Sequence, residues 1–428
     1  MRDVDRVCDA HEIDPRDRGL LRRIVGTEVR RRATLRAVLR SIAPAMSNPD
    51  MVAHMHVAMT QALFLDRIPA HAVVAEASDA VRRTLGPAKV RIVRECLRSV
   101  YERLENAHSG DPRRDLVGRN LGFREPVFRD PEQHPLLWAE DAYSMPAPLL
   151  KLWTARWGEE TAFALAKLAL DEPPLSIRVV RGTREEVASE LKDVETRPGT
   201  HPSVLLAPAS ATEDVTQSSA FVEGRITVQG ESALRAAEAV EARAGEEVLD
   251  LCAAPGGKTA VLAQSGARVV ACDVSDEKLA RVASTLERLR ITSGVELVAS
   301  AFGEALGERR FAAVLADAPC SNTGVLAQRP EARWRFGPKS RGELVELQTR
   351  LFERAASFVG PGGRLVWSTC SIEPEENRRA VDAFLASHSG WTLELDCASL
   401  PDVDTTQARG AGPIDGGYFA RLRREPAK

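Results

Sequence analysis

The sequence predicts a chain of two unlike halves, an all-helical N-terminal domain and a C-terminal α/β domain with a doubly wound, parallel sheet. Up to about Leu104 the apolar residues recur every three or four positions, which is the period of packed helices. From Glu246 onward, short β-rich runs alternate with helical stretches, as in sheets whose strands are joined by crossover helices. A chain of 428 residues is also too long for one ordinary core.

The elements between these halves are less regular. Between residues 105 and 148 the apolar density falls while Pro, Gly, Arg and Asp accumulate, which predicts a connector. Helical patterning resumes in LLKLWTARWGEETAFALAKLAL and stops at Pro173 and Pro174. A strand (LSIRVV), a helix (REEVASELKDV) and a strand (SVLLAP) then predict a small mixed α/β unit that ends near Phe221.

The C-terminal half contains six β-rich runs: EEVLDLCA, ARVVACDV, VELVAS, FAAVLADAP, GRLVWSTC and GYFARLRR. The helical stretches DEKLARVASTLERLR and ELVELQTRLFERAASFV lie between them. In doubly wound sheets the ligand binds at the carboxyl ends of the strands. We therefore expect three regions, residues 1–125, 126–225 and 226–428, with the chemistry in the last.

The composition restricts the protein class. Hydrophobic residues make up 44% and charged residues 28%, which argues against a disordered tail or a membrane protein. No apolar run approaches the roughly 20 residues that cross a bilayer, and the N-terminus has no apolar signal-peptide segment, so we expect a cytoplasmic protein. The seven cysteines are odd in number and lack CxxC spacing, which favours free thiols over disulfides or a zinc site.

The charge pattern leaves nucleic-acid binding open. The formal net charge of −3 lacks the basic excess typical of proteins that bind polyanions without selectivity. Locally, residues 16–40 contain nine arginines against Asp17 and Glu28. Either a solvated helix face or an RNA-binding platform would explain this run.

The first C-terminal strand runs into a turn of small residues, LDLCAAPGGKT. Ala253, Ala254, Gly256 and Gly257 would let the backbone approach a ligand closely, and the next helix would offer free N–H groups. The turn has neither GxGxxG nor GxxxxGK[ST] spacing, which argues against dinucleotide and nucleoside triphosphate sites. A merely tight turn is the structural alternative.

Polar residues follow three further strands at the same predicted edge. Asp273 ends the second strand, where such folds use an acid to accept hydrogen bonds from ribose hydroxyls. The alternative is a helix N-cap, for which Ser275 or Asp276 would serve equally well. Cys320 and Cys370 fall just past two other strand ends. We expect the remaining cysteines outside the small-residue turn to be buried and inert: Cys8, Cys96, Cys272 and Cys397.

The motifs LDLCAAPGGKT, DAPCSNTGVL with RPEARW after it, and STCSIEPEEN resemble, in this order, the signature motifs of the Sun/RsmB-type RNA cytosine carbon-5 methyltransferases. FVEGRITVQGES is similar to the segment that enters their catalytic domain, and DGGYFARLRR to their last strand. DRGLLRRIVGTEVRRRATL and LDRIPAHAVVAEASDAVRR resemble the NusB-like helical domain of bacterial members. The resemblance covers nearly the whole chain. It implies a Rossmann-like S-adenosylmethionine-dependent methyltransferase domain, preceded by an all-α NusB-like domain and a small mixed α/β region that binds RNA.

The resemblance also implies residue roles. Cys370 would add to carbon 6 of cytosine, because carbon 5 attacks a methyl group only after the ring is activated. Cys320 would help remove the carbon-5 proton, and Asp317 would hydrogen-bond the ring edge of an extruded base. The residues expected to bind S-adenosylmethionine are Cys252, Ala253, Ala254, Pro255, Gly256, Gly257, Lys258, Asp273 and Asp317. The expected partner is RNA, small-subunit ribosomal RNA above all, and we expect a monomer without a metal.

Two positions depart from the family pattern. After the third strand, Ser300 and Ala301 stand where relatives usually carry an acid near the adenine. The family sequence Arg-x-Asn is matched by Arg178, with Val180 in place of the Asn. The first departure motivates an alternative, a non-catalytic RNA-binding or ribosome-assembly factor with the same fold. A DNA cytosine methyltransferase would use a Pro-Cys nucleophile without STCS, and an amino-group methyltransferase would carry Asn/Asp-Pro-Pro-aromatic, so neither fits as well.

Overall fold

The computed structural model describes residues 2–291, 293–401 and 415–426. These residues form two compact units that divide between Asp171 and Glu172. The predicted boundary between residues 125 and 126 falls inside the first unit, and the one between 225 and 226 falls inside the second. No helix of this described part is long and apolar enough to cross a membrane.

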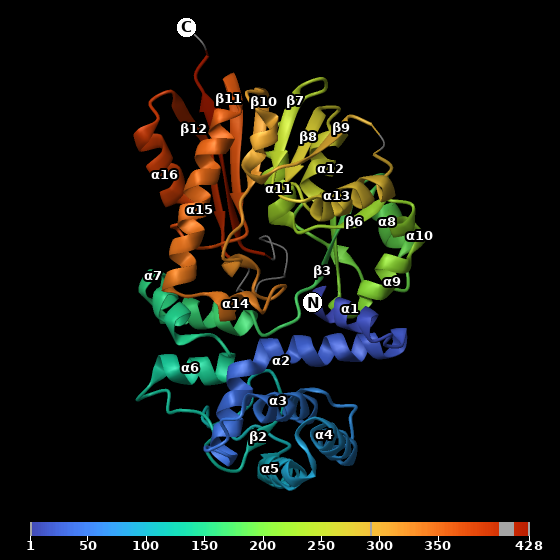
Figure 1. Ribbon diagram of the computed structural model, residues 1–428, viewed down its shortest axis with the longest axis vertical. Helices are drawn as coiled ribbons and strands as arrows, with labels where there is room; N and C mark the ends of the chain where they lie inside the picture. Colours follow the sequence, from blue (N-terminus) through green and yellow to red (C-terminus); the bar gives the residue numbers. More distant parts are fainter. Residues whose placement is uncertain (1, 292, 402–414, 427–428) are drawn as a thin grey trace. The chain divides into compact units, whose positions relative to one another are not determined.

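The first unit confirms the predicted all-helical N-terminal domain (Figure 1). Asn48 begins one of its helices, because its side chain accepts a hydrogen bond from the Met51 backbone N–H at 3.0 Å. A two-stranded ladder of β1 (Leu104–Glu105) and β2 (Gly122–Phe123) also lies in this unit. The helices are α1 (Arg2–Ala10), α2 (Pro15–Ile42), α3 (Pro49–Phe64), α4 (Ala70–Leu85), α5 (Val90–Arg103), α6 (Pro135–Tyr143) and α7 (Ala147–Leu168).

Buried hydrogen bonds tie the segment after residue 125 to the first helices. The Thr34 hydroxyl donates to the Asp141 backbone oxygen at 2.7 Å. The Ala33 N–H donates to the Ser144 hydroxyl at 2.9 Å. Because both bonds join α2 to the end of α6, residues 126–171 pack with the N-terminal helices.

The arginine run of α2 is largely engaged inside its own unit. Arg31 is buried, with its guanidinium 5.0 Å from the centre of the Phe64 ring and donating to the Val117 oxygen at 2.9 Å. Arg32 pairs with Glu28 at 2.7 Å. Arg18 and Arg22 likewise pair with acids of α1. Much of the run therefore stabilises the helices, and the RNA platform stays a prediction.

The second unit begins with a small mixed region that contains the predicted strand, helix and strand and extends past the predicted end near Phe221. Its elements are β3 (Leu175–Val179), α8 (Arg184–Glu190), β4 (Arg197–Pro198), β5 (Val204–Ala207), α9 (Thr212–Gln217), α10 (Ser219–Val222) and β6 (Ile226–Val228). Its four strands form an antiparallel sheet in the order β4-β5-β3-β6. Thr183 and Glu186 start α8 with a capping box, in which each side chain accepts a hydrogen bond from the other's backbone N–H.

A seven-stranded sheet forms the rest of the unit, in the order β12-β13-β11-β10-β7-β8-β9. The strands are β7 (Glu247–Leu251), β8 (Arg268–Asp273), β9 (Val295–Ala299), β10 (Phe311–Asp317), β11 (Val359–Thr369), β12 (Trp391–Ser399) and β13 (Gly417–Arg424). The strands β7 to β11 pair in parallel, as predicted. The expectation of an entirely parallel sheet was wrong for β13, which lies between β11 and β12 and is antiparallel to both. The strand β12 was not predicted.

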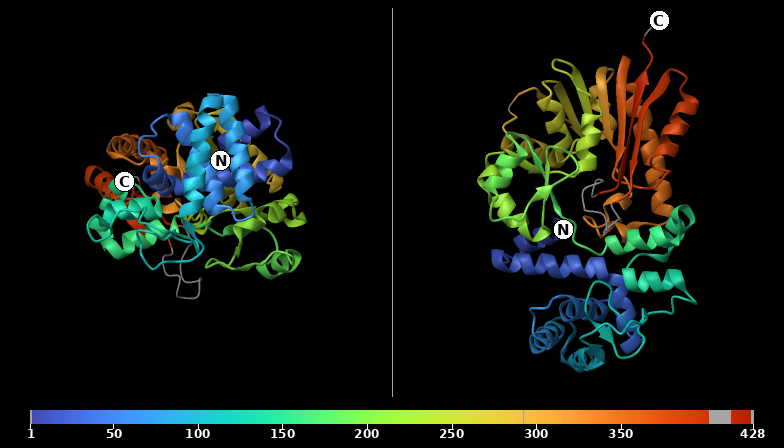
Figure 2. Two further views of the ribbon diagram at one scale, coloured as in Figure 1. Left: turned by 90° about the horizontal axis from the view of Figure 1, so that it is seen from below. Right: turned by 180° about the vertical axis from the view of Figure 1, so that it is seen from behind.

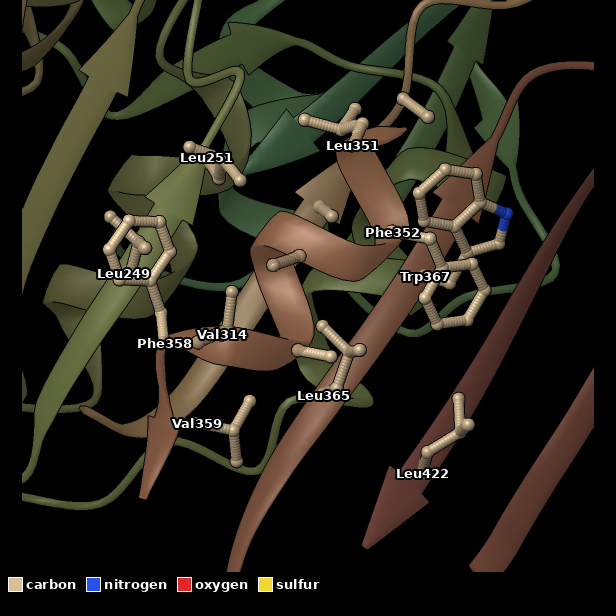
Figure 3. Packing of buried hydrophobic residues seen from close by; sticks show 14 of the residues in the cluster. Leu249, Leu251, Val314, Leu351, Phe352, Phe358, Val359, Leu365, Trp367 and Leu422 are labelled. Atoms are coloured by element: carbon tan, nitrogen blue, oxygen red, sulfur yellow. The ribbon is translucent and has the colours of Figure 1, made fainter. Parts of the chain in front are cut away.

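Helices cover both faces of this sheet (Figure 2). On one face lie α15 (Pro338–Ser357) and α16 (Arg378–Ser387), whose apolar residues join the largest core cluster. On the other lie α11 (Glu231–Glu238), α12 (Gly257–Gln264) and α13 (Asp276–Arg288). Strand alternation divides the residues, since Leu249 and Leu251 face α15 while Val248 packs against α12. Figure 3 shows Trp367 against Phe352, with ring centres 4.5 Å apart.

We expect Arg31→Ala to lower the free energy of unfolding of the first unit by about 2 kcal/mol, because the change removes a buried hydrogen bond and a cation–π contact. Native-state hydrogen exchange of the amides of residues 33–39 would measure the loss. The matched control is Arg36→Ala, on the exposed side of the same helix, with an expected change within about 0.5 kcal/mol. Equal effects of the two variants would contradict a structural role for Arg31.

Candidate functional site

The candidate site lies where the strand order of the large sheet changes direction. The first strand, β7, pairs with β8 on one side and β10 on the other. Ligands of doubly wound sheets bind at this position, beyond the carboxyl ends of the strands. The turns that follow β7, β8, β10 and β11 carry the residues predicted from sequence, so the sheet places them along one edge (Figure 1).

The turn after β7 has an unusual backbone. Cys252 has a φ of 110°, which a side chain rarely adopts, and its N–H and that of Ala253 both donate to the Cys272 oxygen. Gly256 has a φ of 102°, and an added Cβ would lie 3.1 Å from the Val282 backbone. The turn is therefore drawn tightly against β8 and α13, and its small residues are required by packing as well as by any ligand.

Asp273 holds this turn in place. One carboxylate oxygen accepts the Ala254 N–H at 2.9 Å, and the other accepts the Lys278 ammonium at 2.9 Å. Its side chain is nearly fully buried. The N-cap alternative for Asp273 is wrong, because Ser275 caps α13 by accepting the Lys278 backbone N–H. An acid in this position can accept hydroxyl hydrogen bonds at its remaining lone pairs.

A second buried acid, Asp250 on β7, was not identified from sequence. One of its oxygens accepts the Thr259 hydroxyl at 2.7 Å, and the other has no protein partner within the described chain. Burial raises its pKa to about 7, even though the hydrogen bond from Thr259 and the charge of Lys258 oppose the shift. The one sequence signal for Asp250 is its position between Leu249 and Leu251, because an acid within an apolar strand is unusual.

An ion pair joins the turn after β7 to the end of β10. The Lys258 ammonium lies 2.6 Å from one oxygen of Asp317, and the Ser368 hydroxyl donates to the other at 3.0 Å. Burial lowers the pKa of Lys258 and is the largest single effect, but the charge and hydrogen bond of Asp317, together with the charges of Asp250 and Cys370, outweigh it, so the net shift is upward. Lys258 therefore keeps its positive charge. The side chain of Asp317 is 32% exposed, so it remains accessible to a ligand.

The two cysteines past β10 and β11 are brought into contact. The Sγ atoms of Cys320 and Cys370 lie 3.1 Å apart, and both thiols are free. The Asn322 side chain bridges them, since its Nδ2 donates to the Cys320 oxygen at 2.8 Å and its Oδ1 accepts from the Cys370 thiol at 3.1 Å. The hydrogen bond with Cys370, followed by burial, raises the pKa of Cys320 well above its ordinary value.

Glycines let the two cysteine turns touch. A Cβ on Gly324 would lie 2.4 Å from the Gly416 oxygen and 3.0 Å from that of Cys370. The Gly324 N–H donates to the Cys370 oxygen at 3.0 Å, and the Gly416 N–H donates to the Gly324 oxygen at 2.8 Å. Three segments thus meet by their backbones, which leaves no room for a side chain.

Three of the four cysteines that were expected to be buried are buried. Cys8, Cys96 and Cys272 are buried in the core. Cys397 is not buried, because it lies on the partly exposed strand β12, so that expectation was wrong. Cys252 is close to the site, yet burial raises the pKa of its thiol far beyond the ordinary range, which leaves it unreactive.

The two departures from the family pattern lie at different places. The Ser300 backbone N–H donates to the backbone oxygen of Asp273 at 2.8 Å, so Ser300 lies at the same edge of the sheet as the candidate site. Its hydroxyl accepts the Ala305 N–H at 2.9 Å. Arg178 is buried on β3 and donates to the Gln264 side chain at 2.9 Å, at the far end of α12 from the cysteines. Arg178 therefore links the small sheet to α12.

The arrangement is suited to nucleophilic chemistry beside a bound nucleotide-like group. One thiol, that of Cys370, lies within the electrostatic influence of the Lys258 ammonium and can serve as a nucleophile. A second thiol in contact with it can exchange a proton. A carboxylate, Asp317, and a tight turn of small residues stand beside them.

Two family models match this chain. Residues 237–412 match the family described as 16S rRNA methyltransferase RsmB/F, and residues 2–102 match the NusB family. The ribosomal RNA small subunit methyltransferase B of Serratia proteamaculans (strain 568) is 30% identical over 437 residues, covering 96% of this chain and 91% of that protein. The protein of the same name from Enterobacter sp. (strain 638) is 34% identical over 284 residues, 65% of each chain. The crystal structure of PH0851 has 28% identity and a TM-score of 0.76, covering 98% of this chain and 93% of that one.

We expect mild oxidation with diamide to join Cys320 and Cys370 in a disulfide, because their sulfur atoms already touch and little backbone movement is needed. Peptide mass spectrometry of the oxidised protein would identify the bond. Cys272→Ser serves as the control, since it removes a different cysteine and should leave the bond unchanged. A product in which Cys320 pairs only with another cysteine would contradict the geometry.

Proposed function

Because the chain belongs to the RsmB/F family of 16S rRNA methyltransferases, we propose that it transfers a methyl group from S-adenosylmethionine to carbon 5 of a cytosine in small-subunit ribosomal RNA. The observation that carries this proposal is the contact between the thiols of Cys320 and Cys370 beside the Lys258–Asp317 ion pair. Cytosine carbon 5 is a poor nucleophile, and a thiolate adjacent to the base is the means of activating it.

The edge of the sheet fits S-adenosylmethionine, which supplies an electrophilic methyl group when bound. Asp273 would accept the ribose hydroxyls with its free lone pairs. Val274, next to it, is 58% exposed and offers an apolar face to a purine ring. The turn from Cys252 to Lys258 would surround the methionine part, where small residues permit close approach.

In the proposed reaction Cys370 attacks carbon 6 of the cytosine, and a sulfur–carbon bond forms as the 5,6 double bond opens. The electron pair then makes carbon 5 nucleophilic. Carbon 5 would take the methyl group as the bond between that group and the sulfonium sulfur breaks, with S-adenosylhomocysteine as the leaving group. Asp317 would hold the ring edge by hydrogen bonds, while Lys258 keeps Asp317 oriented and offsets the charge that develops on the base. The cytosine must be unpaired or extruded to reach these groups.

Release requires a base for the carbon-5 proton, and the local interactions explain how Cys320 can become one. In the resting protein its pKa is raised first by the hydrogen bond with Cys370 and next by burial. Once the sulfur of Cys370 is bonded to carbon, that hydrogen bond and the charge of a Cys370 thiolate are both removed. The pKa of Cys320 then falls, so its thiol can give up its own proton to solvent. The resulting thiolate can take the carbon-5 proton as the bond between Cys370 and carbon 6 breaks.

We expect Cys370→Ala to abolish methylation, because no covalent adduct can form. Cys320→Ala should instead trap a covalent protein–RNA adduct, because the adduct forms but the carbon-5 proton stays. Bisulfite sequencing of ribosomal RNA would measure methylation, and a denaturing gel would detect the adduct. Cys397→Ala, a partly exposed cysteine outside the site, is the control and should behave as the unaltered protein. Methylation that survives Cys370→Ala would overturn the assigned roles.

We expect Asp273→Asn to weaken S-adenosylmethionine binding at least about tenfold, since it replaces a charge-assisted acceptor by a neutral amide. Isothermal titration calorimetry would measure the affinity. Asp276→Asn, an exposed acid three residues away on α13, is the matched control with unchanged affinity. If the unaltered protein neither bound the cofactor nor methylated RNA, the non-catalytic RNA-binding or assembly factor would be favoured instead.

A further inference from the structure

A buried carboxylate, Glu376, lies behind the two cysteine turns and has no part in the reaction proposed above. Its side chain is 0% exposed. Its Oε2 accepts the Ser321 backbone N–H at 2.8 Å and the Gln348 side-chain amide at 2.9 Å. Its Oε1 accepts the Ser321 hydroxyl and, at 2.8 Å, that of Ser371. Four donors surround the carboxylate, which is the arrangement that suits its ionised form.

The partners of Glu376 come from both turns that carry the cysteines. Ser321 directly follows Cys320, and Ser371 directly follows Cys370. The hydroxyls of these two serines are also 3.0 Å apart. One buried acid therefore connects the two turns immediately behind their reactive sulfur atoms, and Gln348 anchors it to α15.

The charges around the two thiols are unequal. The carboxylate of Glu376 acts on Cys320, where its negative charge adds to the larger effects of the Cys370 hydrogen bond and burial in raising the pKa of that thiol. The ammonium of Lys258 interacts instead with Cys370. A like charge disfavours a thiolate and an opposite charge favours it, so the surroundings distinguish two otherwise similar cysteines.

We propose that Glu376 is a positioning residue that holds the two cysteine turns against each other. Its negative charge disfavours a thiolate at Cys320, so that Cys370 is the more reactive thiol of the two. Its kinetic consequence rests on the proposed function, since a misplaced thiolate would lower kcat without changing KM. The difference in reactivity between Cys370 and Cys320 should be present in the protein without RNA or cofactor. It therefore can be tested even if methylation fails.

The test is alkylation of the full-length protein by a limited pulse of iodoacetamide, which reacts with thiolates, followed by peptide mass spectrometry. In the unaltered protein, Cys370 should be labelled faster than Cys320. Glu376→Gln removes the charge, so the ratio of Cys370 to Cys320 labelling should fall about tenfold. The matched control is Glu375→Gln, which changes a partly exposed acid paired with Arg379 at 2.9 Å and should keep the original ratio.

A conservative variant separates the charge from mere packing. Glu376→Asp keeps the negative charge and should retain the preference for Cys370, even with a lower thermal midpoint, and it serves if Glu376→Gln does not fold. Loss of the preference in Glu376→Asp, or an unchanged ratio in a folded Glu376→Gln, would overturn the proposal. Retained selectivity in a protein that does not methylate RNA would reject the proposed function and leave this inference standing.

Discussion

The parallel pairing of β10 between β7 and β11 is the constraint on which the candidate site depends. Parallel strands end at the same edge of a sheet, so three turns that are far apart in the sequence meet there. In the register of these strands Leu315 lies opposite Asp250, and Asp317 opposite Ser368. The ion pair of Lys258 with Asp317 and the contact of the two thiols both follow from this register. A slip of β10 by one residue would turn the side chains of Leu315 and Asp317 to the opposite face of the sheet.

Three buried acidic side chains are the second feature on which the site depends. The side chains of Asp250, Asp273 and Glu376 are almost completely buried. Asp250 accepts a hydrogen bond from Thr259 of α12, whereas Asp273 and Glu376 accept hydrogen bonds from the turns after β7 and β10. A buried ionised group is expensive unless it is paired or hydrogen-bonded, so these acids fix the turns that supply their partners. Glu376, which links the two cysteine turns, also contributes its charge to the surroundings of the Cys320 thiol. The position of the two cysteine turns and the reactivity of their thiols therefore depend on the same carboxylate.

The N-terminal unit shows that composition alone is a poor guide to function. The arginines of α2 suggest a nucleic-acid surface, yet Arg31 is buried against Phe64 and Arg32 is paired with Glu28. Their long side chains cover apolar surface while their charges find partners within the unit. A substitution of the buried Arg31 is therefore expected to change the stability of the unit.

The sequence by itself determined the order of the elements, the parallel part of the large sheet and the motifs that identify the family. Apolar periodicity is a local property, and each motif is contiguous, so both can be read along the chain. It did not predict β12, the antiparallel direction of β13, or the packing of residues 126–171 with the first helices. Those features depend on pairing between distant segments, such as that of Thr34 with Asp141.

Tertiary structure alone decided which polar residues meet. Glu373, Glu375 and Glu376 cannot be told apart in the sequence, but the fold brings the carboxylate of Glu376 to both cysteine turns, where Ser321 and Ser371 donate to it. Asn322 likewise lies within a recognised motif, and its bridge between the cysteines requires two turns 48 residues apart to touch. Contacts and burial are set by the whole fold, because a side chain's electrostatic surroundings come from every element packed around it. The chemistry of the two thiols is therefore a property of the folded sheet edge rather than of the motifs that contain them.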